Sequence, residues 1–363
     1  ASAGIIGQPV IFQRGLSQSV HPETPDWSQN YNINLTQPLY QGGRIQAKIH
    51  QAELKKQIAA LTSADNEAEI KLVLLQQYMT LFSYYKQREV LARNIEESEH
   101  RLKDIRRMKK EGIVTRNDEI RSELQLTNDR LAYQEADNSI AIASQQLDIL
   151  LGLDESQLIV PDTTLLYTTV SVSDYDTYVQ LADNNYPDMQ IVRQQTLLAE
   201  NDIRLTKANY LPSLSLHAGN TLARPLSTTL ADMYNNNWNI GLILSYNLSS
   251  LYQNKHKMHE ARQTVQLQKY AEELLMQDIR IQIRTAYTRH KEALSRIEAL
   301  KLSVSQAEEN YRIVQNRYLN QLSILTDLLD ASSVRLDAEL QLTVARTQAI
   351  YTYYELQRTC GML

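Results

Sequence analysis

The residues that interrupt regular secondary structure are scarce in this chain. Its 363 residues include only 10 glycines and 8 prolines, and most of them lie outside two long blocks. Long helices are therefore favoured over a loop-rich globular fold. Cysteine is scarcer still, because Cys360 is the one cysteine. This excludes an intramolecular disulfide and any metal site that needs several thiolates.

Long apolar runs and an excess of one charge are also missing. No run approaches the roughly 18 to 20 apolar residues that a membrane-spanning helix needs, so any crossing of a bilayer must be made by strands. The net charge of −5 comes from well-mixed acids and bases. The sequence therefore gives no signal for nucleic-acid binding.

Motifs of catalysis are absent as well. The chain has no HExxH, P-loop, GxSxG or glycine-rich dinucleotide loop. His256 and His259 lie three residues apart in a helical stretch, but the lysines on either side of His256 favour a solvated surface over a metal site. We expect no enzymatic activity, no cofactor and no bound metal.

What the chain does contain is a short two-faced strand that leads directly into a very long helix. Apolar and polar side chains alternate from Tyr31 to Thr36, which is the period of a strand with two different faces. Pro38, Gly42 and Gly43 break this pattern, and neither glycine nor proline follows until Gly112. The sequence therefore predicts a strand over 31–40 and a helix from 44 to about 111, roughly 100 Å long.

A second helix follows at once and forms a hairpin with the first. Gly112 comes after a turn rich in lysine and arginine, which is typical of a helix C-cap. Thr115 and Asp118 have the spacing of a capping box and predict a new helix start. The predicted helical hairpin covers 44–151. Its second helix carries apolar residues spaced like a coiled-coil seam, namely Ile120, Leu124 and Leu131.

The same succession recurs in the second half of the chain. We predict helices over 174–209, strands over 211–222 and 238–248, and a second hairpin over 252–358 with its turn near Asn320 to Ser323. Another strand is predicted over 1–13, and because the chain begins inside it, we expect an N-terminal portion to precede Ala1. Identical residues recur at an offset of 209 positions, which indicates a duplicated unit with repeats at 1–173 and 174–363. The pairs are Tyr78 and Tyr287, Asp118 and Asp327, Leu131 and Leu340, and Gly152 and Gly361.

Four strands are too few to close a sheet on themselves. An open sheet in lipid leaves the N–H and C=O groups of its edge strands without partners, at a cost of several kcal/mol each. Two copies of the chain would give eight strands around a lumen filled by side chains, whereas three copies would give twelve strands around a channel. We therefore expect a trimer. The alternative is a soluble coiled-coil scaffolding protein without transport activity.

Several motifs together resemble the TolC-like outer-membrane efflux protein family, and the resemblance covers nearly the whole chain. They are Gln37-Pro38-Leu39-Tyr40-Gln41-Gly42-Gly43, Tyr186-Pro187-Asp188, Lys207-Ala208-Asn209-Tyr210-Leu211-Pro212-Ser213-Leu214, Leu325-Thr326-Asp327-Leu328-Leu329-Asp330-Ala331 and Tyr354-Glu355-Leu356. The N-terminal helix of the family is absent from this sequence.

The resemblance implies a mainly helical fold with a membrane β-barrel part. Three chains would form a twelve-stranded barrel in the outer membrane of a Gram-negative cell, continued into the periplasm by a barrel of helices. The function implied is that of a passive exit duct of a tripartite efflux pump or a type I secretion system. Its partners would be a periplasmic adaptor, an inner-membrane transporter and outer-membrane lipid.

The resemblance also assigns candidate site residues. Asp327 and Asp330 match the family's constriction acids, and under threefold symmetry they would form two rings of carboxylates. Asp118 and Tyr318 match positions that hold the closed mouth together. The best-defined closed member has an arginine two residues after its tip glycine, where this chain has Ser323, with Gln321 in place of the glycine. An arginine latch is therefore not expected here.

Two further groups complete the candidate residues. The hairpin tips are expected to dock the adaptor, because tips at the far end of a long helix are placed to meet an inner-membrane assembly. They comprise Gly112, Ile113, Val114 and Thr115 in the first hairpin and Leu322, Ser323 and Ile324 in the second. The strand-to-helix junctions are expected to depend on Pro38, Gly42, Gly43 and Pro212.

Overall fold

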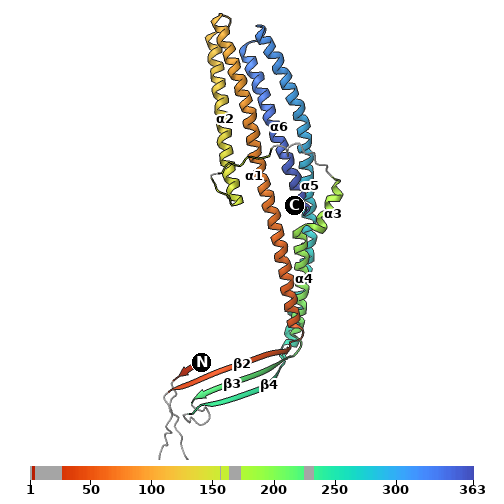
Figure 1. Cartoon of the computed structure of the whole chain (residues 1–363). Coiled ribbons are helices and arrows are strands. Elements are labelled where there is room, and N and C mark those ends of the chain that lie inside the picture. Colours follow the sequence, from red (N-terminus) through yellow and green to blue (C-terminus); the bar gives the residue numbers. More distant parts are fainter. Residues whose placement is uncertain (1, 5–26, 156, 163–172, 225–232) are drawn as a thin grey trace, which may run out of the picture. The chain divides into compact units, whose positions relative to one another are not determined.

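The structure is a computed structural model that describes residues 2–4, 27–155, 157–162, 173–224 and 233–363. It is mainly helical, with long helical hairpins and a small antiparallel sheet, as the sequence predicts (Figure 1). No helix of the described residues is both long and apolar enough to cross a membrane.

The strands lie close to the predicted segments. They are β1 (Ser2–Gly4), β2 (Ser28–Tyr40), β3 (Ser213–Arg224) and β4 (Asn235–Ser245). Residues 5–13 of the predicted first strand lie outside the described residues. β4 begins and ends three residues before the predicted bounds. It ends at Ser245 because this residue pairs with Ser213, the first residue of β3. Tyr246 and Leu248 therefore have no strand opposite them and leave the sheet.

The helices form two hairpins joined by two shorter helices. The first hairpin consists of α1 (Arg44–Lys110) and α2 (Arg116–Leu151), and the second of α5 (Ser250–Leu319) and α6 (Leu325–Thr359). Between the hairpins lie α3 (Tyr175–Asn185) and α4 (Pro187–Ala208).

The chain is divided into two compact units, and each draws on both halves of the sequence. The first unit comprises Ala1–Gln57 and Gln194–Tyr270, and the second comprises Ile58–Arg193 and Ala271–Leu363. The first unit therefore contains the sheet and its junctions with the helices, and the second contains the hairpin tips.

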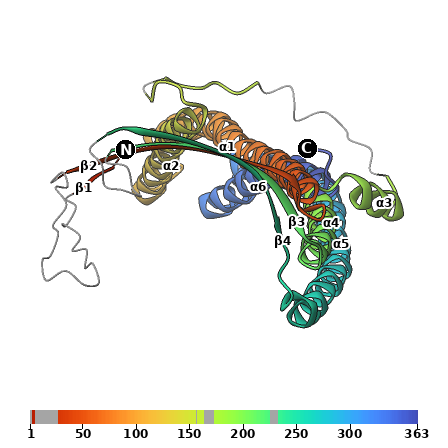
Figure 2. The ribbon, with the colours of Figure 1, turned by 90° about the horizontal axis from the view of Figure 1, so that it is seen from below.

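The sheet of the first unit has the strand order β1-β2-β3-β4, and the strands lie side by side in a curved layer (Figure 2). Ile33 pairs with Asn220 and Leu35 with Ala218, which in turn pairs with Ile240. Directly paired residues share a face, so one face of the sheet is mostly apolar. Its side chains are largely exposed in the single chain, with Ile33 at 75% and Ile240 at 77% of full exposure.

The opposite face of the sheet is polar. Asn34 pairs with Gly219, which pairs with Asn239. A side chain at Gly219 would meet the amide oxygen of Asn239 at 2.7 Å and that of Asn34 at 2.9 Å, so the small residue leaves room for the two amides. On the same face, Thr36 Oγ1 lies 3.4 Å from His217 Nδ1.

Among the described residues, the core of the second unit forms three separate clusters. The largest joins α3, α4, α5 and α6 around fully buried Ile283 and Leu356. A second cluster packs Leu81 of α1 against Ile140 and Leu147 of α2. The third lies next to the hairpin tips and is described below.

The predicted coiled-coil seam of α2 is wrong for contacts within the chain. Its three residues are largely exposed, Leu124 at 60%. The buried face of α2 instead includes Leu126, Asp129 and Ile140. The sequence pattern misled because this packing face is partly polar: Asp129 Oδ2 accepts a 2.6 Å hydrogen bond from Ser98 of α1.

Candidate functional site: the hairpin tips and the strand-to-helix junctions

The first tip is a left-handed turn followed by a capped helix. Gly112 has a φ of 75°, and Ile113 N–H donates to the Met108 carbonyl at 2.9 Å, which closes the end of α1. The side chain of Thr115 accepts from Asp118 N–H, and the Asp118 carboxylate accepts from Thr115 N–H at 2.8 Å. The capping box predicted from the sequence is thus confirmed.

The second tip has the same conformation without a glycine. Gln321 has a φ of 60°, a backbone conformation that costs an ordinary residue about 1–2 kcal/mol. Leu322 N–H donates to the Arg317 carbonyl at 2.8 Å and closes α5 as Ile113 closes α1. Gln321 lies 209 positions after Gly112, and Gly361 has a φ of 70° where Gly152 has 68°. These recurrences support the proposal of a duplicated unit.

The aspartates of the second tip are solvent-exposed. Asp327 Oδ2 accepts a 2.8 Å hydrogen bond from Ser323 Oγ, so Ser323 binds an acid of its own hairpin. Asp330 lies three residues further along α6 and is also exposed. Positions three apart lie on neighbouring parts of one helix face.

Tyr318 is buried where the two hairpins pack together beside the tips. Its cluster includes Ile105 of α1 and Leu325 and Leu328 of α6. Burial, and to a lesser extent the charge of Asp118, raises the pKa of Tyr318. Its hydroxyl is buried and has no hydrogen-bond partner within the described part of the chain. The structure thus places Asp118 near enough for its charge to disfavour ionisation of Tyr318.

Two further contacts that the sequence did not reveal connect the hairpins. Arg121 of α2 donates to Thr326 Oγ1 of α6 at 2.5 Å. Arg335 of α6 pairs with Glu97 of α1, and its guanidinium lies 4.2 Å from the centre of the Tyr311 ring. These pairs are separated by about 200 residues or more, so no local sequence pattern could have indicated them.

A network of charges surrounds the first tip. Glu119 accepts hydrogen bonds from Lys109, at 2.5 Å, and from Arg116. These two cations lower the pKa of Glu119 to about 2. Arg106 also lies 3.4 Å from the Glu119 carboxylate. The basic last turn of α1, which in the sequence is typical of a helix C-cap, is therefore tied to the first turn of α2.

The strand-to-helix junctions bring the predicted Pro38, Gly42, Gly43 and Pro212 into one unit. The register between β2 and β3 shifts between Pro38 and Tyr40. Gly42 has a φ of 60°, and a side chain there would meet Leu211 Cβ at 2.8 Å and the Ala208 carbonyl at 2.9 Å. Gly43, with a φ of 85°, has open space around it. Gly42 therefore allows the β2–α1 junction to contact the α4–β3 junction, next to Pro212.

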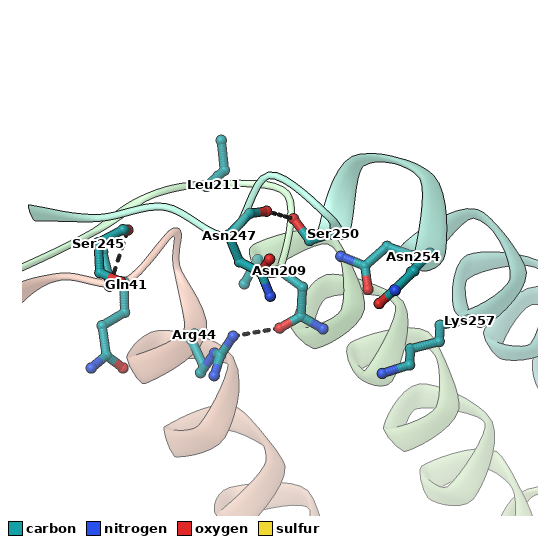
Figure 3. A pocket seen from close by; sticks show the side chains of 12 residues that line it. Gln41, Arg44, Asn209, Leu211, Ser245, Asn247, Ser250, Asn254 and Lys257 are labelled. Carbon is teal, nitrogen blue, oxygen red and sulfur yellow. Dashed lines mark hydrogen bonds between the residues drawn. The ribbon is translucent and has the colours of Figure 1, made fainter.

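These junctions enclose a cavity of about 350 Å³. Figure 3 shows residues from α1, from the α4–β3 junction and from the start of α5 around it. Arg44 donates to Asn209 Oδ1 across the junctions. The sequence analysis did not predict this cavity, because its wall comes from three separate segments.

Metal binding finds no support in the described residues. They contain no group of three or more histidine, cysteine, aspartate or glutamate side chains suitable for a metal ion.

The family of the chain follows from a comparison with known proteins. A family model described as "Outer membrane efflux protein" matches residues 15–153 and 178–362, which is most of the chain. The chain belongs to this family. It is therefore an outer membrane efflux channel of a Gram-negative bacterium and not an enzyme, and the soluble scaffolding alternative is wrong. Members of the family form trimeric channels.

Solved structures of the same fold are similar to the chain in shape but distant in sequence. The outer membrane protein VceC of Vibrio cholerae is 17% identical, with a TM-score of 0.77 over 99% of this chain and 86% of that one. The CmeC outer membrane channel of Campylobacter jejuni is 16% identical, with a TM-score of 0.75 over 99% and 76%. The open state of the MtrE outer membrane channel of Neisseria gonorrhoeae is 17% identical, with a TM-score of 0.71 over 99% and 81%. A search of curated proteins finds no match.

Proposed function

We propose that three copies of this chain form a passive exit duct of a tripartite efflux pump or a type I secretion system. Each copy contributes four strands to a closed sheet of twelve, with the apolar face toward outer-membrane lipid and the polar face toward a wet lumen. The exposed apolar and polar faces of β2 and β4 support this arrangement. The helices continue the duct into the periplasm.

The observation that carries the mechanism is the exposure of Asp327 and Asp330 beside the second tip. Around a threefold axis, these residues form two rings of three carboxylates at the periplasmic mouth and favour cations there. Asp118 and buried Tyr318 hold the two hairpins together at this end. Closure rests on the contacts between hairpins, such as Arg121 to Thr326, since Ser323 replaces the arginine latch.

Single-channel recording in planar bilayers tests the constriction. The native trimer should be cation-selective and blocked by trivalent cations added from the periplasmic side, and Asp327→Ala/Asp330→Ala should lose most of both properties. The control is Glu292→Ala/Glu298→Ala, which removes two exposed carboxylates of α5 about 40 Å from the tip. Equal loss of selectivity in the two double variants would disprove a local constriction.

The hairpin tips dock a periplasmic adaptor that opens the duct together with an inner-membrane transporter. Exposed apolar side chains at both tips support this assignment: Ile113 is 43% exposed, Leu322 67% and Ile324 65%. Apolar side chains this exposed at the end of a long hairpin are available for a partner.

Adding charge to the tips tests the docking. Leu322→Glu/Ile324→Glu should abolish drug export in cells while trimers still form, and Leu302→Glu, at a residue of α5 with 60% exposure, should not affect export. Normal export by the tip variant would mean that the adaptor binds elsewhere.

A further inference from the structure

The cavity at the strand-to-helix junctions has an unusual chemical composition. Two cationic side chains, Arg44 and Lys257, belong to its wall, and no carboxylate does among the described residues that line it. The remaining wall is mainly amide and hydroxyl groups. They are Gln41, Asn209, Ser213, Ser245, Asn247, Ser250, Gln253 and Asn254, with Ala208 and Leu211 as the apolar members.

Three acceptor atoms of this wall are already used within the protein. Asn209 Oδ1 accepts from Arg44. Asn247 Oδ1 accepts from Ser249 N–H at 3.1 Å and from Ser249 Oγ at 2.8 Å. The Ala208 carbonyl accepts from Leu211 N–H at 3.2 Å. An amide whose oxygen is engaged keeps its NH₂ group as a donor, so Asn209 and Asn247 act as donors in this wall.

The orientation of Asn209 shows where such a donor lies. Because Arg44 holds Oδ1, the Nδ2 group must lie on the other side of the amide. Figure 3 shows that side to be the side of Lys257, whose chain extends from α5. Arg44, Asn209 and Lys257 thus lie in succession along one wall.

Asn254 provides a second, independent observation. It is only 4% exposed, and its Nδ2 is buried without a hydrogen-bond partner in the described parts of the chain. An unsatisfied buried donor is destabilising, and such groups in native proteins call for an explanation. A bound acceptor in the cavity satisfies this requirement.

Two helices begin at the cavity wall, α1 at Arg44 and α5 at Ser250. A helix N-terminus carries a partial positive charge, which favours a bound anion. The first N–H group of each helix is already used, because Arg44 N–H donates to the Gln41 carbonyl and Ser250 N–H to the Asn247 carbonyl. The cationic side chains, the amide donors and the two helix starts all favour a bound anion.

We propose that this cavity binds a phosphate-type oxyanion, as the phosphodiester of an anionic phospholipid or as free phosphate. Arg44 and Lys257 supply charge, and Asn209 and Asn254 supply amide donors. The lipid source rests on the proposed placement of the sheet in the membrane, because the exposed apolar face of the sheet ends at these junctions. The free-phosphate source does not depend on it.

Binding to the purified full-length trimer in a non-ionic detergent tests the proposal. The probes are dihexanoyl phosphatidylglycerol, dihexanoyl phosphatidylcholine as a zwitterionic control, and inorganic phosphate, each titrated by calorimetry. Arg44→Gln and Lys257→Gln should each weaken binding of the anionic probe about tenfold or more, since a hydrogen bond to a charged group is worth about 1.5–3 kcal/mol. Asn254→Leu keeps the shape, removes the donor and should weaken binding several-fold.

The matched control is Lys255→Gln, which removes another exposed lysine of α5 that does not line the cavity. Binding of phosphatidylglycerol alone identifies a lipid site, and binding of inorganic phosphate identifies a site for the free ion. Absence of binding for both anionic probes overturns the proposal, as does equal weakening by Lys255→Gln and Lys257→Gln. If trimers conduct ions but bind neither anionic probe, the anion site is disproved and the proposed duct is not. If trimers bind an anionic probe but do not conduct ions, the proposed duct is disproved and the anion site is not.

Discussion

Gly42 and Gly43 offer a direct test of the junction geometry, because both have positive φ values but differ in their surroundings. Replacing Gly43 by alanine adds a methyl group in open space, so the cost is that of the left-handed backbone, about 1–2 kcal/mol. The reduced entropy of the unfolded chain offsets this by about 0.4–1 kcal/mol. Gly43→Ala should therefore destabilise the protein by about 1 kcal/mol.

Gly42→Ala has the same backbone cost and a steric cost in addition. The new Cβ lies 2.8 Å from Leu211 Cβ, well inside the roughly 3.5–4.0 Å of an ordinary carbon contact. The Ala208 carbonyl lies 2.9 Å away on backbone that cannot rotate aside. Overpacking of this kind typically costs about 1–3 kcal/mol, so the total is about 2–4 kcal/mol.

Urea unfolding of the purified protein in detergent, followed by circular dichroism, measures both variants against the native protein. Gly42→Ala should have the lower unfolding midpoint of the two, with a similar slope. Equal midpoints, or a lower midpoint for Gly43→Ala, would refute the close contact between the two junctions.

Three other predictions concern the second unit. Gln321→Gly should raise the free energy of unfolding by up to about 1 kcal/mol, because relief of the left-handed strain exceeds the entropy cost of glycine. Gly112→Ala should lower the free energy of unfolding, and the urea midpoints of the two variants test both expectations. Burial raises the pKa of Cys360 to about 11, so at pH 8 a maleimide should label it far more slowly in the folded protein than in urea, and equal rates would contradict its burial. The pKa of Glu119 falls from 4.5 to about 2 in the folded protein, so its contribution to stability is full above pH 4.5 and is lost as the pH falls through 2. The difference in thermal midpoint between the native protein and Glu119→Gln should shrink over that range, and a difference independent of pH would exclude the Glu119 ion pairs as its cause.

Structural features that depend on neighbouring residues were predictable from the sequence. The capping box of Thr115 and Asp118, the left-handed Gly112 and the alternation of Tyr31 to Thr36 each depend on a few adjacent positions. Propensity, capping and strand period act at that range, so the hairpins and the strands β2, β3 and β4 could be located to within about three residues.

Features that depend on distant segments were not predictable. The end of β4 depends on Ser213 of β3, and the packing face of α2 depends on Ser98 of α1. The cavity at the strand-to-helix junctions joins Arg44, Asn209 and Lys257, whose positions in the sequence give no hint of their proximity. The exposed apolar seam of α2 misled for the same reason, because periodicity reveals an apolar face but not what covers it.

The pairing of β2 with β3 has a consequence for biogenesis. Thr36 and His217 face each other across these strands although 181 residues separate them, whereas Ser98 and Asp129 of the first hairpin are only 31 residues apart. Short-range contacts form early and long-range strand pairing forms late. As the polypeptide is made, β2 therefore cannot pair with β3 until the first hairpin, α3 and α4 have all been synthesised. Until then it has an unpaired hydrogen-bonding edge and an uncovered apolar face. Such strands are prone to aggregate. Substitutions in β2 will therefore lower the yield of correctly assembled protein before they lower its stability. The strand needs a chaperone during that interval.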